Sequence, residues 1–299
     1  MKRSKITTRL ITAAGILIVL AVVTLAVIHV LAGRTPRWRG SKSFLKSFIR
    51  STLDSRSVKS FRSGDYTSII FLHQSTGRNL IDQGKVREQL QQSGYAFWDH
   101  DYNDIGLRSP NGQFTSYSYN VPKDNTDPDG LAGIFKQPAY PLPFNTFSGL
   151  LQHEVIIIKS CFPNSNIRSQ ERLAQLKAWY LEIRSRMDQY PGKVFILFTP
   201  PPLNPAETSL EAAVRARALA DWLESDEFLK GHPNVSVFDF FNLLAEQEPA
   251  AADYNMLRQS YRNGNDSHPN QLANETIGPL FTQFVIDSIQ TYRSQAAEP

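Results

Sequence analysis

One serine and one histidine, which stand far apart in the chain, have the residue types of a nucleophile and its general base. Ser75 lies in the segment HQSTG of residues 73–77, directly after an apolar run, and His268 follows Asp266 by two positions. An imidazole can take the proton of a serine hydroxyl, and a carboxylate can orient the imidazole and stabilise its charged form. We therefore predict nucleophilic catalysis by Ser75, with His268 as the base and Asp266 as the acid that orients it.

A second polar segment supplies amide groups that could stabilise the negative charge created by such a reaction. Asn164 and Asn166 belong to the segment SCFPNSN of residues 160–166, which follows another apolar run. Side-chain amides can donate hydrogen bonds to an oxyanion. Taken singly, each signal has a structural alternative, because an asparagine-rich turn bonds its own backbone and a serine or histidine before a helix can cap it. The occurrence of all three segments in this order favours a catalytic site.

These segments need a scaffold that brings distant parts of the chain together. After residue 64, apolar runs alternate with amphipathic stretches, which is typical of parallel strands joined by helical crossovers. Such sheets carry their sites at the carboxyl ends of the strands, where Ser75 and Asn164 stand. The predicted strands are 67–73, 95–98, 154–160, 194–199 and 235–240, and the predicted helices are 79–92, 169–190, 209–230 and 269–293. We predict that residues 100–145 form a long polar loop outside the core.

The arrangement resembles the GDSL/SGNH hydrolase superfamily. In that superfamily a serine after the first strand, a glycine in a second block, an asparagine in a third block and a C-terminal Asp-x-x-His block assemble an esterase site. The resemblance covers roughly residue 66 to the end of the closing helix. It implies an α/β fold, a three-layer flavodoxin-like sandwich with a five-stranded parallel sheet.

The resemblance also implies roles for individual residues. Ser75 matches the nucleophile of the superfamily and His268 its base. Gly106, in the segment YNDIGL, matches the glycine of the second block, and Asn164 matches the oxyanion asparagine, with Asn166 as a reserve candidate. The implied oxyanion hole consists of Gly106, Asn164 and the backbone amide of Ser75.

Three departures from the superfamily's pattern indicate a divergent member. His73-Gln74 replaces the Gly-Asp pair before the serine, and the third block reads SCFPN instead of Gly-x-Asn-Asp. The last block has Asp-x-His spacing, so a strict Asp-x-x-His register would put Asn265 at the position of the acid. An imidazolium gains more from a charged partner, which favours Asp266 and keeps Asn265 in reserve.

Other residues whose side chains could react or bind a metal have simpler structural explanations. The single cysteine, Cys161, excludes an intrachain disulfide and is more typical of a small packing residue than of a nucleophile. The acidic segment 99–104 has no second histidine cluster to complete a metal site. Residues 125–130 resemble the start of a calcium loop, but its twelfth position is Lys136 and not glutamate. We predict no metal and no cofactor.

The composition separates a basic leader from an acidic body. The chain has 299 residues, 41% of them hydrophobic, which is enough for a sizeable core and excludes a disordered or coiled-coil protein. Residues 1–50 hold ten of the 32 Lys and Arg residues and none of the 28 acidic ones, so the body has 22 basic against 28 acidic residues. Phosphate recognition requires a basic face, and we therefore expect no nucleic-acid partner.

The leader contains a candidate membrane segment. Residues 10–32 include no Asp, Glu, Lys or Arg, and at about 1.5 Å per residue they are long enough to cross a bilayer. We predict a single transmembrane helix rather than a cleaved signal peptide, with the N-terminal tail of residues 1–9 in the cytoplasm and the body outside, in the periplasm or extracellular space. Residues 33–64 form a basic linker, either a plain tether or an amphipathic helix on anionic lipid.

Together these features predict a membrane-anchored serine esterase formed by residues 65–299. Its partners are a lipid bilayer, contacted through residues 10–32, and a small ester or an acylated glycan, with O-acetyl esters of carbohydrate as the expected substrate class. Two alternatives remain: an O-acyltransferase that uses the same site, and a catalytically inactive module that binds a glycan or a protein.

Overall fold

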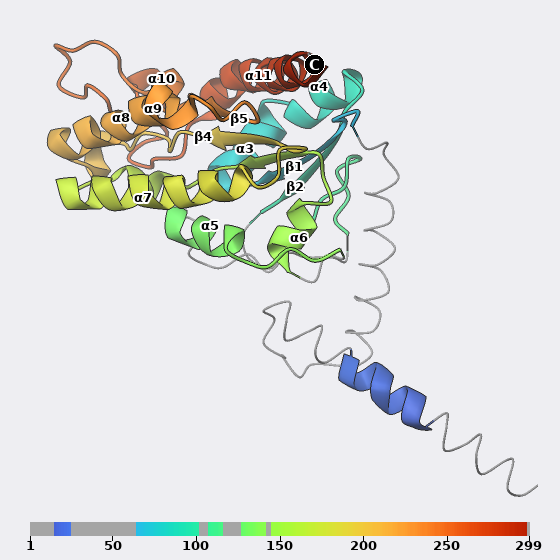
Figure 1. Ribbon diagram of the computed structural model, residues 1–299. Coiled ribbons are helices and arrows are strands. Elements are labelled where there is room, and N and C mark those ends of the chain that lie inside the picture. The colour runs from blue at the N-terminus through green and yellow to red at the C-terminus, as the bar shows by residue number, and fades with distance from the viewer. Residues whose placement is uncertain (1–14, 25–63, 102–106, 116–126, 142–144, 298–299) are drawn as a thin grey trace, which may run out of the picture.

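The computed structural model describes residues 15–24, 64–101, 107–115, 127–141 and 145–297 (Figure 1). Within this part of the chain, five parallel strands form one sheet in the order β2-β1-β3-β4-β5. The strands are β1 (Ser68–Leu72), β2 (Ala96–His100), β3 (Val155–Ile158), β4 (Val194–Phe198) and β5 (Val235–Phe238). This is the order of flavodoxin-like folds, so the predicted α/β class and parallel sheet are confirmed.

The strands are apolar along nearly their whole length because helices cover both faces of the sheet. Ile69 and Phe71 of β1 belong to the core on one face, while Ile70 and Leu72 belong to the core on the other. Helices α3 (Ser75–Gln83), α4 (Val86–Gln92) and α11 (Gln271–Ala297) cover the first face, and α5 (Pro128–Phe135), α7 (Gln170–Met187) and α8 (Leu210–Glu224) cover the second (Figure 1).

Because the strands are parallel, all their carboxyl ends meet on one side of the sheet and all their amino ends on the opposite side. We call these two sides the carboxyl edge and the amino edge, after the ends of the strands that meet there. Shorter elements complete the described chain: α6 (Thr146–Leu150), α9 (Asp226–Leu229), α10 (Phe240–Leu244) and the 3₁₀ turns η2 (Phe162–Ser165), η3 (Pro205–Glu207) and η4 (Gln259–Tyr261).

The first crossover differs from the single predicted helix 79–92. Helix α3 begins at Ser75, and Lys85, in the left-handed conformation at φ 54°, separates it from α4. A Cβ atom on Gly84 would lie 2.8 Å from the Cα of Gly278 in α11, so the two backbones touch there. This close approach explains the glycine and the break in the helix.

The segment 100–145 was predicted to be loop, and this prediction is wrong for part of it. Helix α5 buries Leu131, Ala132, Ile134 and Phe135 in the core it shares with α7. Its sequence PDGLAGIF is short and begins with proline, which is favourable in the first turn of a helix. The surrounding polar residues masked this short apolar stretch.

The predicted helix 209–230 is also divided. Ser225 has an extended conformation, ends α8 and precedes α9, so the chain turns before β5. Two serines start the long helices of this face as side-chain caps. Ser169 accepts a hydrogen bond from the backbone N–H of Arg172, and Ser209 accepts one from Ala212.

The leader is described only at residues 15–24, which are helical and exposed (blue in Figure 1). Among the described residues, no helix is long and apolar enough to cross a bilayer, so the structure does not support the predicted transmembrane helix. The remaining residues of the predicted span 10–32, and the predicted linker as far as residue 63, lie outside the described residues.

Candidate active site

The structure brings Ser75 and His268 together at the carboxyl edge. The Ser75 Oγ and His268 Nε2 atoms are 2.7 Å apart, and both residues are partly exposed. Ser75 is the third residue after β1, and His268 lies just before α11, which packs on α3. Parallel strand order and helix packing therefore place a hydroxyl and an imidazole from opposite ends of the chain within hydrogen-bond distance.

Asp266 completes a linear chain of contacts. Its Oδ1 atom lies 2.7 Å from His268 Nδ1 and also accepts the backbone N–H of His268 at 3.1 Å. A carboxylate only accepts, so Nδ1 carries the ring proton and Nε2 is left to accept the Ser75 hydroxyl. Burial raises the pKa of Asp266, but hydrogen bonds and charge from His268 outweigh it and hold that pKa below the ordinary value. The ionised acid is thus favoured.

The second hydrogen bond explains why a two-residue spacing is sufficient. A carboxylate that accepts the N–H two residues later forms an Asx turn, which brings its oxygen next to that residue. Asn265 is exposed, and it is Asp266 that contacts the ring. The geometry therefore agrees with the Asp-x-His reading and not with the reserve candidate Asn265.

Helix α3 supplies the position of Ser75. Ser75 is the first residue of the helix, so the backbone N–H groups of its first turn have no partner within the helix and point toward the carboxyl edge. Such groups and the helix dipole favour negative charge. Gly77 allows the helix to sit close to the strand, because a Cβ atom there would lie 2.5 Å from the Cβ of His73.

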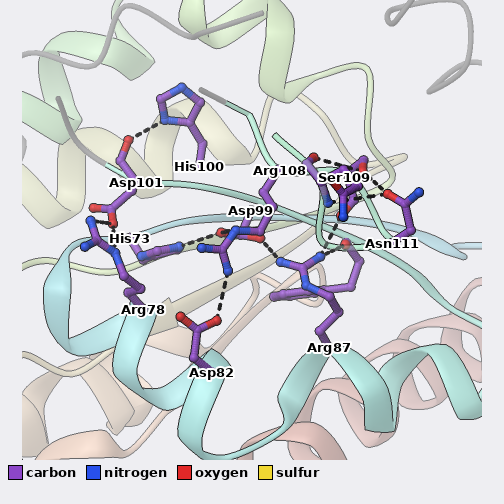
Figure 2. A network of polar contacts seen from close by, with 12 residues as sticks. His73, Arg78, Asp82, Arg87, Asp99, His100, Asp101, Arg108, Ser109 and Asn111 are labelled. Atoms are coloured by element: carbon purple, nitrogen blue, oxygen red, sulfur yellow. Dashed lines mark hydrogen bonds and ion pairs between the residues drawn. The ribbon is translucent and has the colours of Figure 1, made fainter. Parts of the chain in front are cut away.

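A buried polar network begins at His73, two residues before Ser75, and Figure 2 shows its side chains. Asp99, the fourth residue of β2, pairs with the Arg87 guanidinium through Oδ1 and contacts His73 Nε2 at 3.1 Å through Oδ2. The other ring nitrogen of His73 lies 2.9 Å from the carbonyl oxygen of Gln74, the residue before Ser75. Burial lowers the pKa of His73 to about 4, so the ring is neutral and donates its one N–H to one of these two oxygens, while both contacts place it beside the start of α3.

The same network extends to the neighbouring residues of the edge (Figure 2). Arg78 of α3 pairs with Asp101, and Arg108 donates to Asp82 at 2.8 Å. Lys159 after β3 is fully buried, and burial lowers its pKa to about 8. Sequence reasoning treated the acidic residues here as a polar loop and overlooked their ion pairs, because each partner lies on another element.

The loop after β3 lies beside the histidine. The ring of Phe162 contacts the ring of His268 edge-on, with 4.9 Å between centroids. Asn164 is buried, and its side-chain amide donates to the carbonyl of Cys161 at 3.2 Å. The amide of Asn166 donates to the backbone carbonyl of Glu207 at 3.3 Å, so Asn166 links two loops.

The remaining candidates have clear places. Gly106 lies outside the described residues. Cys161 is a buried free cysteine. No group of three or more His, Cys, Asp or Glu side chains that could hold a metal ion occurs in the described ranges, and the carboxylates of Asp99 and Asp101 pair with arginines.

No protein-family model and no curated protein matches the chain. Among solved structures it is similar to a proposed acylhydrolase from Bacteroides fragilis NCTC 9343, with 10% identity, TM-score 0.47, and coverage of 84% of this chain and 100% of that one. It is similar to a GDSL-like lipase from Bacteroides thetaiotaomicron VPI-5482, with 8% identity, TM-score 0.43, and coverage of 81% and 99%. A proposed platelet activating factor from Streptococcus pneumonia has 12% identity, TM-score 0.45, and coverage of 81% and 94%.

Proposed function

We propose that this protein is a serine hydrolase of the SGNH type that cleaves an acyl ester. The observation that carries the proposal is the continuous chain Ser75 Oγ, His268 Nε2, His268 Nδ1 and Asp266 Oδ1, with 2.7 Å at each of its two hydrogen bonds. It lies at the carboxyl edge of a parallel sheet, at the start of a helix, where such folds bind their ligands.

The mechanism follows from the roles of these groups. Ser75 Oγ attacks the ester carbonyl carbon while its proton passes to His268 Nε2, and Asp266 stabilises the imidazolium. The carbonyl oxygen becomes an oxyanion, which the N–H groups at the start of α3 stabilise, together with Asn164 and Gly106 in their proposed roles. His268 then gives its proton to the leaving alcohol, and a second attack by water, with His268 again as base, releases the acid and restores Ser75.

We further propose a small O-acyl ester, such as an acetyl ester of a carbohydrate, as the substrate. If an alcohol replaced water in the second step, the same residues would transfer the acyl group to it, since the acyl-serine intermediate is common to both reactions. Product analysis with and without an added sugar alcohol distinguishes the two: free acid alone indicates a hydrolase, and an acylated sugar indicates a transferase.

A fluorophosphonate probe tests the nucleophile directly, because it reacts only with an activated serine. We expect mass spectrometry of the labelled full chain to find the adduct on Ser75, and no adduct on Ser68, a buried serine that also contacts a histidine. The His268→Gln variant should lose labelling. Absence of labelling at Ser75 in the parent protein would favour the catalytically inactive binding module instead.

We also propose that residues 10–32 hold the protein at a membrane, with the N-terminus in the cytoplasm and the hydrolase outside. The charge-free sequence of this segment, and the helix of exposed apolar residues at 15–24, support this placement. The full chain should remain with membranes after a carbonate wash, and a variant without residues 10–32 should be released. Protease added to intact spheroplasts should digest the body; a protected body would reverse the proposed orientation.

A further inference from the structure

A buried asparagine on a different loop contacts the segment that carries the acid and the base. Asn204 lies beyond β4, just before η3, and only 3% of it is exposed. Its side-chain amide donates to the backbone carbonyls of Gly264 at 3.0 Å and Asp266 at 3.3 Å. Both N–H groups of one amide are therefore committed to the backbone immediately before His268.

The residue between acid and base points the other way, into this contact. Ser267 is fully buried, whereas Asp266 and His268 keep 50% and 28% of their side chains exposed. Such alternation is that of an extended segment, in which neighbouring side chains point to opposite sides. The Ser267 hydroxyl accepts the backbone N–H of Asn204 at 2.9 Å and donates to the carboxylate of Glu207.

Three side chains thus form one unit, which we call the 204 clamp: Asn204, Ser267 and Glu207. The clamp joins the loop after β4 to the Asp-x-His segment. Two hydrogen bonds come from the Asn204 side-chain amide, and the Ser267 hydroxyl makes two more, to the Asn204 backbone and to Glu207. The segment it holds is otherwise surface chain, because residues 263–266 are exposed and Gly264 has a positive φ of 60°. An exposed turn of this kind samples many conformations unless other residues order it.

We propose that the 204 clamp is a positioning device for catalysis, in which Asn204 and Ser267 act through Asp266 and His268 without touching substrate. This inference rests on the proposed function. It accounts for the shortened Asp-x-His spacing: Asp266 can place one oxygen on both N–H groups of His268 because its own carbonyl is held by Asn204. A displacement of about 1 Å at reacting groups can cost on the order of 100-fold in rate.

The main test is Asn204→Ala with Asn234→Ala as a matched control. Asn234 is also buried, and its amide also donates to two backbone carbonyls, those of Met187 and Tyr190 at 3.4 Å each, but it lies at the amino edge. We expect both variants to lower the melting temperature by similar amounts. Only Asn204→Ala should lower kcat, by roughly 10- to 100-fold with little change in KM. Equal activity of the two variants would refute the clamp.

A second variant separates positioning from simple loop stability. Asn204 Oδ1 accepts the N–H of Ala206, which caps η3, and Asn204→Asp keeps that acceptor while it loses both donors. If the donors to Gly264 and Asp266 matter, Asn204→Asp should be at least as inactive as Asn204→Ala. Recovery of activity in Asn204→Asp would mean that Asn204 only shapes its own turn.

A spectroscopic readout distinguishes failure of the clamp from failure of the proposed function. The Nδ1–H proton that His268 shares with Asp266 gives its own NMR signal, which a His268→Gln variant identifies. We expect this signal in the parent and in Asn234→Ala, and its loss or broadening in Asn204→Ala and Ser267→Ala. An unchanged signal in both clamp variants overturns the clamp, whereas a parent that shows the signal but hydrolyses no ester overturns only the proposed function.

Discussion

The two edges of the sheet each carry a serine hydrogen-bonded to a histidine. At the carboxyl edge, Ser75 Oγ lies 2.7 Å from His268 Nε2, and at the amino edge, Ser68 Oγ lies 3.1 Å from His153 Nδ1. The residue types are the same, but the surroundings differ. Ser68 and His153 are buried, and burial lowers the pKa of His153 to about 3.

The third group also differs between the edges. Asp266 contacts Nδ1 of His268, the ring nitrogen that does not face Ser75. Glu154, the acid next to His153, instead accepts backbone N–H groups from Gly64 at 2.7 Å and Thr67 at 2.9 Å. In the proposed function Asp266 orients a base, whereas Glu154 holds the chain ahead of β1. The proposed function depends on three features that accompany the contact at the carboxyl edge: partial exposure, a carboxylate on the second ring nitrogen of His268 and a helix N-terminus at Ser75.

The largest expected difference between the edges is in activity. Ser75→Ala should reduce kcat/KM for an activated acetyl ester by roughly 10⁴- to 10⁶-fold, because no nucleophile remains. Ser68→Ala should leave kcat/KM within about twofold and lower the free energy of unfolding by about 1–3 kcal/mol, as expected for a lost buried hydrogen bond. Ester hydrolysis and urea titration of both variants test this; a Ser75→Ala variant with parental activity would contradict the proposed function.

Loss of the Asp266 carboxylate should have the second largest effect on activity. Asp266→Asn should lower kcat by roughly 10²- to 10⁴-fold, because the amide no longer stabilises the imidazolium or enforces the productive tautomer. Asn265→Ala should change kcat by less than about threefold, since Asn265 is exposed and Asp266 contacts the ring. A larger loss of kcat in Asn265→Ala than in Asp266→Asn would instead favour the Asp-x-x-His register, in which Asn265 orients His268.

Disturbing the close packing next to Ser75 should have a smaller but still measurable effect on activity and stability. Gly77→Ala puts a Cβ atom 2.5 Å from the Cβ of the buried His73, so we expect a loss of about 1–3 kcal/mol in unfolding free energy and a lower kcat as α3 shifts. Gly133→Ala is the control, because an added Cβ at this exposed position of α5 meets no atom within 4 Å and should stabilise by about 0.5–1 kcal/mol. Thermal melts and kcat of both variants check this.

The last expected effect is a pH dependence of the free energy of unfolding that comes from the amino edge. Burial lowers the pKa of His153 from 6.5 to about 3, so between these values the unfolded chain binds a proton that the folded chain does not. Stability should therefore fall as the pH falls through this window, by up to about 1.4 kcal/mol per pH unit from this residue. Urea titrations of the parent and His153→Gln should give a shallower slope for the variant; identical slopes would contradict the assignment.

Much of the fold could be predicted from the sequence, because the buried strands are continuous apolar runs. The run before Ser75 became a strand one residue shorter at each end than the predicted 67–73, and the run of residues 194–199 became a strand one residue shorter at its C-terminal end. Boundaries that depend on packing could not be predicted. The break at Gly84 follows from contact with Gly278, and buried α5 depends on a core surface made by α7.

The site was predictable to the same extent. Ser75, Asp266 and His268 have residue types and order that indicate their chemistry, and the structure brings them together. Asn204 and Ser267 could not be found in this way, because an asparagine or serine in a loop has no periodicity or motif that reports its distant partner. Phe162 could not be identified from the sequence either, since only the fold brings its ring against the ring of His268.

By itself the sequence determined which side chains have the residue types of a nucleophile, a base and an acid, and which segments are apolar enough to form the sheet. The tertiary structure decided which of two chemically equal Ser–His contacts is accessible, and which of two neighbouring residues, Asn265 or Asp266, faces the imidazole. The physical reason is that reactivity depends on burial, on distances of about 3 Å and on the direction of hydrogen bonds. These quantities arise between parts of the chain that folding brings together.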